Sequence, residues 1–235
     1  MDETMRLPIP GRTILKSHIA FIETVVAVSL TVLGLLAVVD AAHPAQAQQT
    51  GTVVPVDQLM AENALPDVPL GKDDAPITIV EYASMTCSHC AAFYATTFPD
   101  LKSKYIDTGK VRFILREFPL DPLATAGFML ARCAGPDKRN AMVDLLFAQQ
   151  KNWAFTEKPI EALSNLVKQT GMTQEAFEAC LKDQALYEKV NDIRNRAAEK
   201  FGINATPTFF INGRKQTGEI TPEKLDELLQ PMLKG

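Results

Sequence analysis

The sequence predicts an α/β fold in which a β-α-β half and a later β-β-α half are separated by a long helical segment. Three observations carry this prediction. An apolar strand pattern at 77–82 is followed by a helical pattern and by an alternating strand at 111–118, and a strand–helix–strand unit of this kind places its strands parallel. Residues 121–202 then show helical periodicity. Finally, an apolar run leads to Asn212-Gly213, a strong signal for a two-residue hairpin.

Residues 1–47 are predicted to be a secretory signal peptide. Three basic residues precede an apolar stretch at 19–39, and a small-residue A-x-A pattern ends at Ala47. The alternative is an uncleaved membrane anchor, because 19–39 is long enough to span a bilayer if Glu23 is tolerated there. The A-x-A pattern favours cleavage after Ala47, and therefore export.

Charge and composition exclude some classes of function. The chain has 24 Lys and Arg and 28 Asp and Glu, of which residues 1–47 hold three and four, so the mature net charge is near −3. No basic face of the kind that binds nucleic acid is expected from this balance. All four cysteines lie beyond residue 47, in an oxidising compartment where disulfides persist.

The segments of the first half follow from turn residues and periodicity. Residues 48–73 are rich in proline, glycine and polar side chains and are predicted to be a flexible N-terminal lead. The first half of the domain is placed at 74–120. Its strand at 77–82 is mostly apolar, which suits a central position in a sheet. The apolar positions of the following helix recur every three or four residues, and Pro99 is expected to kink it.

A helical insertion is predicted at 121–202. Glycine and proline divide it, and Thr173 is a plausible N-cap for one of its helices. An amphipathic stripe that begins at Leu186 ends with Gly202, a residue favoured just after a helix. The helices are expected at 123–134, 141–150, 159–169, from 174 through 180, and at 186–201.

The second half of the domain is placed at 203–235. It begins with a strand at 208–211, and the hairpin signal predicts an antiparallel partner at 215–219. Thr221-Pro222 then supplies an N-cap followed by proline at the first helical position, so a final helix starts there.

The chemistry is predicted to reside in Cys87-Ser88-His89-Cys90, where the first strand passes into the helix. A helix start has free backbone N–H groups and the positive end of the helix dipole, and both stabilise a thiolate. Ser88 adds a hydroxyl, and His89 adds a cation when it is protonated. We interpret Cys87 as the exposed catalytic sulfur and Cys90, one turn further in, as the resolving thiol.

Other interpretations of a C-x-x-C pair were weighed. Such a pair can be an inert bridge or half of a zinc site, but zinc needs a second ligand pair at short range, and no other cysteine is near. We therefore expect no metal and prefer redox chemistry. A module of a different class, metal-binding or chaperone-like, would hold copper or zinc through Cys87, His89 and Cys90.

Taken together, the chain resembles the thioredoxin fold, with a helical insertion, of the DsbA-like family of periplasmic thiol–disulfide oxidoreductases. The resemblance covers most of residues 67–233. It implies a periplasmic enzyme that introduces disulfide bonds into exported proteins by dithiol–disulfide exchange, without a cofactor. It further implies reduced exported proteins as substrates and a DsbB-like membrane quinone reductase as recycling partner, and we expect a monomer. The residues that carry it are Glu81, Cys87-Ser88-His89-Cys90, Phe93-Tyr94 and Thr206-Pro207-Thr208.

The resemblance also assigns roles to residues outside the cysteine pair. It implies a cis Thr206–Pro207 bond facing the cysteines, with Ser88, Thr206 and Pro207 contacting a substrate chain that adds as a strand. A proline that opens a strand is otherwise ordinary. The family's buried acid maps onto Glu81, with a role in proton transfer to the second cysteine; the alternative is an acid paired with a nearby lysine.

One position departs from the family pattern. Many of the family's oxidases have Pro-His between the cysteines, whereas this chain has Ser88-His89. Residues at these positions tune the thiolate pKa and the reduction potential. An isomerase or reductase of the same fold therefore stays open as an alternative to an oxidase.

Cys133 and Cys180 lie near helix ends in the insertion, 47 positions apart. In an oxidising compartment we predict a structural disulfide between them, worth about 4 kcal/mol in the chain-entropy model. The alternative is two buried free thiols that behave as small apolar residues. Some DsbA-like proteins are similar in having a second disulfide in the helical domain.

Overall fold

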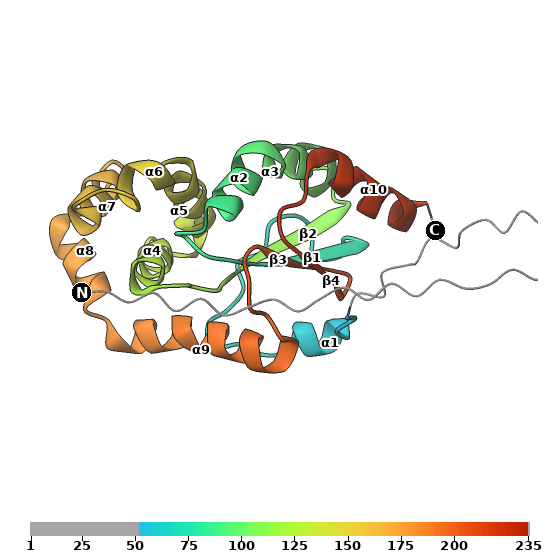
Figure 1. Ribbon diagram of the computed structural model, residues 1–235, viewed down its shortest axis with the longest axis horizontal. Helices are drawn as coiled ribbons and strands as arrows, with labels where there is room; N and C mark the ends of the chain where they lie inside the picture. The colour runs from blue at the N-terminus through green and yellow to red at the C-terminus, as the bar shows by residue number, and fades with distance from the viewer. Residues whose placement is uncertain (1–51, 235) are drawn as a thin grey trace, which may run out of the picture. The chain divides into compact units, whose positions relative to one another are not determined.

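A four-stranded sheet stands at the centre of the part that the computed structural model describes, residues 52–234 (Figure 1). The strands are β1 (Ile77–Ala83), β2 (Val111–Glu117), β3 (Thr208–Ile211) and β4 (Arg214–Thr217). Their spatial order is β2-β1-β3-β4, with β1 parallel to β2 and the β1–β3 and β3–β4 pairs antiparallel. This order confirms the predicted α/β class with a β-α-β half and a β-β-α half.

The predicted signal peptide at 1–47 lies outside the described residues, and so does its apolar stretch. Within residues 52–234, no helix combines the length and the apolar composition that crossing a membrane requires.

The hairpin between β3 and β4 turns at the predicted Asn212-Gly213. The two residues have positive φ angles of 45° and 81°, which glycine adopts freely and asparagine tolerates. The Oδ1 atom of Asn212 also accepts a 2.7 Å hydrogen bond from the backbone N–H of Thr78, so the turn is tied to β1. Strand β4 ends at Thr217, short of the predicted limit of 219, because Gly218 turns the chain with a φ of 92°.

Helices cover both faces of the sheet (Figure 1). Pro99 lies at the start of the second helical segment after β1, and the long helix predicted there is interrupted at Thr97. Because proline has no N–H, it fits the first turn of a helix better than the interior. One face carries α2 (Ser88–Thr96), α3 (Phe98–Leu101), the π-helical turn η1 (Lys102–Ile106) and α10 (Pro222–Leu233), and the other carries α9 (Gln184–Phe201) and the short α1 (Val56–Leu59).

The insertion is helical throughout, as predicted, with side-chain caps at several starts. Asp121 and Thr173 accept hydrogen bonds from backbone N–H groups of α4 and α8. Helix α5 begins at Pro136 and not at the predicted residue 141, because Gly135 breaks the chain with a φ of 87° and proline is favoured at a first helical position. The helices before α9 are α4 (Pro122–Cys133), α5 (Pro136–Ala148), α6 (Gln150–Trp153), α7 (Pro159–Lys168) and α8 (Gln174–Leu181).

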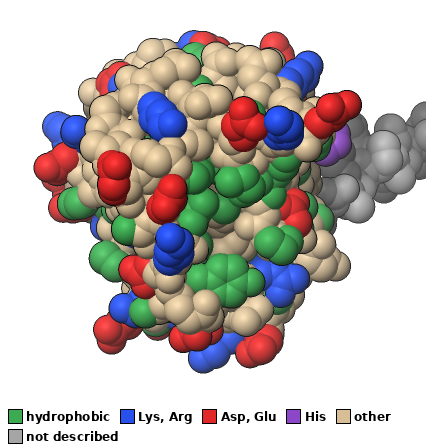
Figure 2. All heavy atoms as spheres, turned by 90° about the vertical axis from the view of Figure 1, so that its left-hand side faces the viewer, with side chains coloured by type: hydrophobic (Ala, Val, Ile, Leu, Met, Phe, Trp, Pro, Cys, Tyr) green, Lys and Arg blue, Asp and Glu red, His purple; other side chains and the backbone are tan. Residues whose placement is uncertain are grey.

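A disulfide joins Cys133, at the end of α4, to Cys180 in α8, with the Cα atoms 6.2 Å apart. This is the pair that the sequence analysis assigned to a structural bridge. Figure 2 looks onto the end of the molecule that the insertion forms and shows apolar side chains in its middle, with charged side chains of both signs around them. A cavity of about 480 Å³ adjoins the bridge and includes Met172 and Ala176 in its lining. The bridge thus holds α8 to α4 beside this cavity.

The lead, predicted to be flexible over 48–73, is packed against the sheet in its described part. Val53 forms an antiparallel bridge with Arg214 in β4, and Leu70 forms another with Phe113 in β2. Strands β4 and β2 are the two edges of the sheet. One segment therefore pairs with both edges, which protects them from pairing with other chains.

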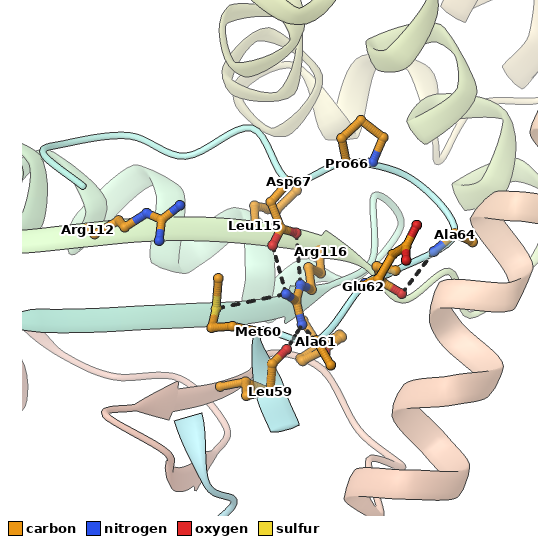
Figure 3. Close-up of polar contacts among 12 residues, drawn as sticks. Leu59, Met60, Ala61, Glu62, Ala64, Pro66, Asp67, Arg112, Leu115 and Arg116 are labelled. Atoms are coloured by element: carbon orange, nitrogen blue, oxygen red, sulfur yellow. Dashed lines mark hydrogen bonds and ion pairs between the residues drawn. The ribbon is translucent and has the colours of Figure 1, made fainter. Parts of the chain in front are cut away.

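A buried ion pair holds the middle of the lead (Figure 3). Arg116 of β2 is 1 % exposed and donates to the carboxylate of Asp67 at 2.9 and 2.7 Å. It also donates to the carbonyl of Leu59 at 2.6 Å and to the hydroxyl of Tyr82 at 3.0 Å. Because these contacts satisfy the guanidinium on several sides, the cost of burying its charge is offset, and the lead is fixed despite its polar composition.

This arrangement predicts a large stability loss when Asp67 is replaced by alanine. The variant leaves the buried guanidinium of Arg116 without its counter-ion, which is expected to cost about 3 kcal/mol in the free energy of unfolding measured with urea. The matched control is Asp73→Ala, whose carboxylate is 89 % exposed and lies 3.4 Å from Arg112. An exposed pair of this kind contributes little, so equal losses in the two variants would contradict this account of the lead.

Candidate active site

The two cysteines of the C-x-x-C sequence occupy different environments at the start of α2. Cys87 is the N-cap residue and is half-buried, whereas Cys90 lies within the first turn and is fully buried. The two sulfurs are not bonded to each other, so the structure describes the dithiol form. One sulfur is therefore open to a partner, and the other is enclosed.

Local hydrogen bonding lowers the pKa of Cys87. The neighbouring Cys90 thiol has the largest effect, and partial burial opposes it. The side chain of Thr206 and the backbone N–H groups of Cys90 and His89 lower the pKa further, from 9.0 to about 5. These N–H groups belong to the first turn of α2, the helix start from which the sequence analysis expected thiolate stabilisation. At neutral pH Cys87 is therefore ionised.

Cys90 is affected in the opposite direction. Burial raises the pKa of the Cys90 thiol above its ordinary value, and the Cys87 sulfur and the negative charge of Glu81 raise it further. A thiolate at this position is strongly disfavoured. Any reaction that makes Cys90 a leaving group must therefore supply a proton to it.

The start of β3 lies against the Cys87 sulfur. The Thr206–Pro207 peptide bond is cis, as the family resemblance implied. In its protonated form the Cys87 thiol donates a 3.3 Å hydrogen bond to the backbone carbonyl of Thr206, the carbonyl that belongs to this cis bond. The buried Thr206 hydroxyl has no hydrogen-bond partner among the described residues, so it remains free to donate to a thiolate at Cys87. The fold thus brings together two motifs that are more than a hundred positions apart.

Glu81 is completely buried in β1, on the strand that leads to Cys87. Neither carboxylate oxygen has a hydrogen-bond partner within residues 52–234. Burial raises the pKa of Glu81 well above its usual range. The nearby Tyr94 phenol lowers this pKa in part, although it makes no hydrogen bond of normal length to the carboxyl. The charge on Cys87 raises the pKa further. Glu81 forms no ion pair with a lysine within residues 52–234, so the structure does not support the alternative of an acid paired with lysine. Glu81 is thus a buried carboxyl of raised pKa that interacts electrostatically with Cys90.

The residues between the cysteines are exposed. The His89 side chain is 71 % exposed, and its Nδ1 atom lies 3.4 Å from Oε2 of Glu219. What His89 contributes to the Cys87 sulfur is its backbone N–H, because the helix turns the imidazole toward Glu219. Ser88 is the first residue of α2 and is also exposed. The sequence analysis expected the imidazole itself to favour the thiolate.

The helical insertion supplies contacts to this site that the sequence did not indicate. Gln150 of α6 donates from Nε2 to the carbonyl oxygens of Met85 and Cys87, at 2.8 and 2.9 Å. The Thr86 hydroxyl donates to Oδ2 of Asp121, the N-cap of α4, at 2.5 Å. A glutamine in a helical segment gives no sequence signal for a partner 63 positions away, so only the fold reveals this contact.

The described residues contain no cluster of three or more His, Cys, Asp or Glu side chains placed to hold a metal ion. Cys87 and Cys90 are adjacent, but the imidazole of His89 lies beside Glu219. The arrangement is suited to thiol chemistry, with an outer sulfur of lowered pKa, an enclosed inner sulfur of raised pKa and a buried acid of raised pKa.

Comparison with known proteins places the chain in a family. The family model described as thioredoxin matches residues 63–231. The crystal structure of Wolbachia pipientis alpha-DsbA1 is similar with a TM-score of 0.70 and 31 % identity, over 76 % of this chain and 96 % of that one. BdbD from Bacillus subtilis is similar with a TM-score of 0.63 and 25 % identity, over 72 % of this chain and 94 % of that one. The chain belongs to the thioredoxin family, and the predicted DsbA-like fold with its helical insertion is confirmed.

The curated relatives have names that agree with this family. A Rickettsia felis protein named as a protein-disulfide oxidoreductase is 32 % identical, over 81 % of this chain and 68 % of the relative. A Rickettsia bellii protein named likewise is 38 % identical, over 63 % of this chain and 57 % of the relative. The chain thus spans between about half and two thirds of the length of the Rickettsia relatives that it matches. Their names support the predicted enzyme class.

The site predicts a thiolate that forms in the acidic range. In the reduced protein, the far-ultraviolet absorbance of the thiolate should rise with pH around a midpoint near a pKa of about 5. Cys87→Ser should abolish this transition, whereas Cys90→Ser should keep a single transition at the outer sulfur. A midpoint near the ordinary thiol value, or a transition that survives Cys87→Ser, would contradict the description of Cys87 given above.

Proposed function

We propose that this protein is a thiol–disulfide oxidoreductase that introduces disulfide bonds into exported proteins through Cys87 and Cys90. The observation that carries the proposal is the placement of the two cysteines at the start of α2, with Cys87 half-buried as the N-cap and Cys90 enclosed in the first turn. This placement goes with a lowered pKa at Cys87 and a raised pKa at Cys90. A low-pKa sulfur at a helix start is a good leaving group, and a buried partner sulfur resolves mixed disulfides from within. The names of the relatives support the same class.

The proposed reaction begins with an oxidised Cys87–Cys90 pair. A substrate thiolate attacks Sγ of Cys87, the intramolecular bond breaks, and Cys90 leaves and takes up a proton. A second substrate thiolate then attacks the substrate-side sulfur of the mixed disulfide, and Cys87 leaves as a thiolate. The substrate dithiol has become a disulfide, the enzyme holds the Cys87 thiolate and the Cys90 thiol, and one proton has gone to solvent.

Glu81 is the proposed proton donor to Cys90 in the first step. It is buried on the strand that precedes the cysteine loop, and burial raises the pKa of its carboxyl, which favours the protonated form. A neutral acid beside a departing thiolate supplies the proton that the enclosed site otherwise lacks. In the reverse direction the same group accepts that proton.

Thr206 and Pro207 are proposed to hold the substrate chain next to Cys87. The start of β3 lies beside the sulfur, with the Thr206 carbonyl 3.3 Å away. A substrate chain added as a strand here would present its cysteine to Cys87. Ser88 and His89, both exposed at the start of α2, would face the same substrate.

Oxidation is the proposed direction, because a stabilised Cys87 thiolate favours the reduced form of the enzyme. A Bacillus anthracis relative named as a disulfide bond formation protein is 33 % identical over 61 % of this chain, which supports the same direction. Isomerase or reductase activity remains the alternative. A DsbB-like membrane quinone reductase is the proposed recycling partner of the monomeric enzyme.

The proposed location is the periplasm, after cleavage of the signal peptide at 1–47. The basic flank, apolar stretch and A-x-A pattern support it, and so does the disulfide in the insertion. N-terminal sequencing of the protein from the cell envelope should give a chain that begins after Ala47. A chain that still begins near Met1 would refute cleavage.

The function is tested by exchanging each cysteine for serine. Cys87→Ser should abolish oxidation of a reduced dithiol peptide. When Cys90→Ser is mixed with the oxidised peptide, its Cys87 thiolate attacks the peptide disulfide, and the mixed disulfide should accumulate because the resolving thiol is missing. The reduction potential of the wild-type pair against glutathione then gives the direction. A reduction potential of about −120 mV indicates an oxidase, and one of about −270 mV indicates a reductant. Peptide oxidation that survives Cys87→Ser would end the proposal.

The role of Glu81 is tested with Glu81→Gln, which keeps the shape of the side chain but cannot give up a proton. Attack of a substrate thiolate on the oxidised enzyme should slow by about a hundredfold, measured by stopped-flow fluorescence of Trp153. The folded-state pKa of Glu81 is raised, so the wild type loses stability as pH rises above the ordinary glutamate pKa. Glu81→Gln should therefore be more stable than the wild type at neutral pH.

Glu117→Gln is the matched control, because Glu117 is also a completely buried glutamate, on the neighbouring strand β2. Arg132 and Arg139 hold the pKa of Glu117 at about 2, against the opposing effect of burial. Its contribution to stability is therefore present above the ordinary glutamate pKa, and Glu117→Gln should destabilise the protein at neutral pH. If Glu81→Gln leaves the exchange rate unchanged, Glu81 is not the proton donor.

A further inference from the structure

The most informative contact outside the thioredoxin motifs is made by Gln150, the first residue of α6. Its side chain is 3 % exposed. The Nε2 atom lies 2.8 Å from the carbonyl oxygen of Met85 and 2.9 Å from that of Cys87. Both partner atoms are carbonyl oxygens, which only accept, so the amide nitrogen must be the atom that faces them. Both amide hydrogens are thereby used on the segment that carries the reactive cysteine.

This segment, residues 84–87, is held by two residues of the insertion. It connects β1 to α2, and its own turn is closed by the hydrogen bond from the Cys87 N–H to the Ser84 carbonyl, at 3.0 Å. Thr86 is held by Asp121, the N-cap of α4, at 2.5 Å. Gln150 holds the carbonyl oxygens of Met85 and Cys87. The insertion therefore supports the reactive loop with an acceptor at one helix start and a donor at another.

The contact with the Cys87 carbonyl has an electrostatic consequence at the sulfur. That carbonyl accepts from the Ala91 N–H at 3.2 Å, in the first turn of α2, and from Gln150 as well. A second donor neutralises more of the negative partial charge that the carbonyl oxygen places near its own side chain. It also fixes the rotation of the Cys87–Ser88 peptide plane, which leads directly into the peptides whose N–H groups, those of His89 and Cys90, face the Cys87 sulfur.

We propose that Gln150 is a positioning residue for the redox pair: it orients the Cys87 peptide so that the start of α2 stabilises the thiolate. This inference rests on the proposed thiol–disulfide exchange. It makes the helical insertion part of the machinery that sets the redox poise. Gln150 acts through the backbone and touches neither sulfur, so its effect is on the equilibrium of the pair, and not on which bonds form.

The test compares Gln150→Met with Gln149→Met. Methionine has nearly the size of glutamine but donates no hydrogen bond. The substitution also leaves the titratable side chains of Glu81, His89 and Glu219 unchanged. Gln149 precedes Gln150 directly, and its contact in the structure is a 2.7 Å hydrogen bond that its Oε1 accepts from Asn152. Two quantities are measured for each variant. The first is the pH titration of the Cys87 thiolate absorbance in the reduced protein, and the second is the equilibrium constant for reduction of the Cys87–Cys90 disulfide by glutathione.

In Gln150→Met, the thiolate titration is expected to move up by about one pH unit, and the equilibrium constant to fall about tenfold, equal to about 30 mV in reduction potential. Gln149→Met should match the wild type in both. Thermal unfolding is recorded as well, because a merely structural glutamine would lower the melting temperature and leave titration and equilibrium constant unchanged. That result overturns the inference.

A second variant and the behaviour of the wild type cover the cases in which Gln150→Met alone gives no answer. If Gln150→Met does not fold, Gln150→Ala takes its place, since alanine also lacks the amide donor, adds no charge and should shift both quantities in the same direction. Values equal to the wild type in that variant also overturn the inference. If the wild type itself does not exchange with glutathione, the proposed function fails. If it exchanges and the Gln150 variants behave like it, only the role of Gln150 fails.

Discussion

The structure depends on one constraint at the start of α2: two sulfurs one helical turn apart must have opposite tendencies to ionise. The position of each cysteine at the helix start contributes to this difference. Cys87, as the N-cap, faces the unpaired N–H groups of the first turn, whereas Cys90 has turned inward onto the sheet and is enclosed. Moving the pair along the helix by one residue would take the first sulfur away from these N–H groups. The register of the strand-to-helix junction is therefore what makes the pair chemically useful.

Segments far apart in the sequence maintain this register. Strand β1 carries Glu81 and leads into the loop, the start of β3 brings the Thr206 carbonyl to the Cys87 sulfur, and α6 in the insertion holds the loop carbonyls through Gln150. The thioredoxin-like halves thus contribute the groups that act on the sulfurs. The insertion holds the backbone of Cys87 through Gln150.

What the sequence could predict depends on whether a residue's partners are local. The strands, the Asn212-Gly213 turn and the Thr221 cap follow from short-range rules, and so does the position of Cys87 at a helix start. The cis bond before Pro207 came only from the family resemblance. The packing of the lead was missed because its fixing contact joins Asp67 to Arg116, 49 positions away, and composition alone favours mobility.

The two buried glutamates have opposite environments, and the proposed role of Glu81 depends on this difference. Glu117 lies between Arg132 and Arg139, keeps its charge, and ties β2 to helices of the insertion. Glu81, on the adjacent strand, has no hydrogen-bond partner in the described part, and its burial lowers the stability of the fold. A group that destabilises the folded chain and interacts with Cys90 is best explained by the reaction, because packing alone would favour an apolar residue at that position.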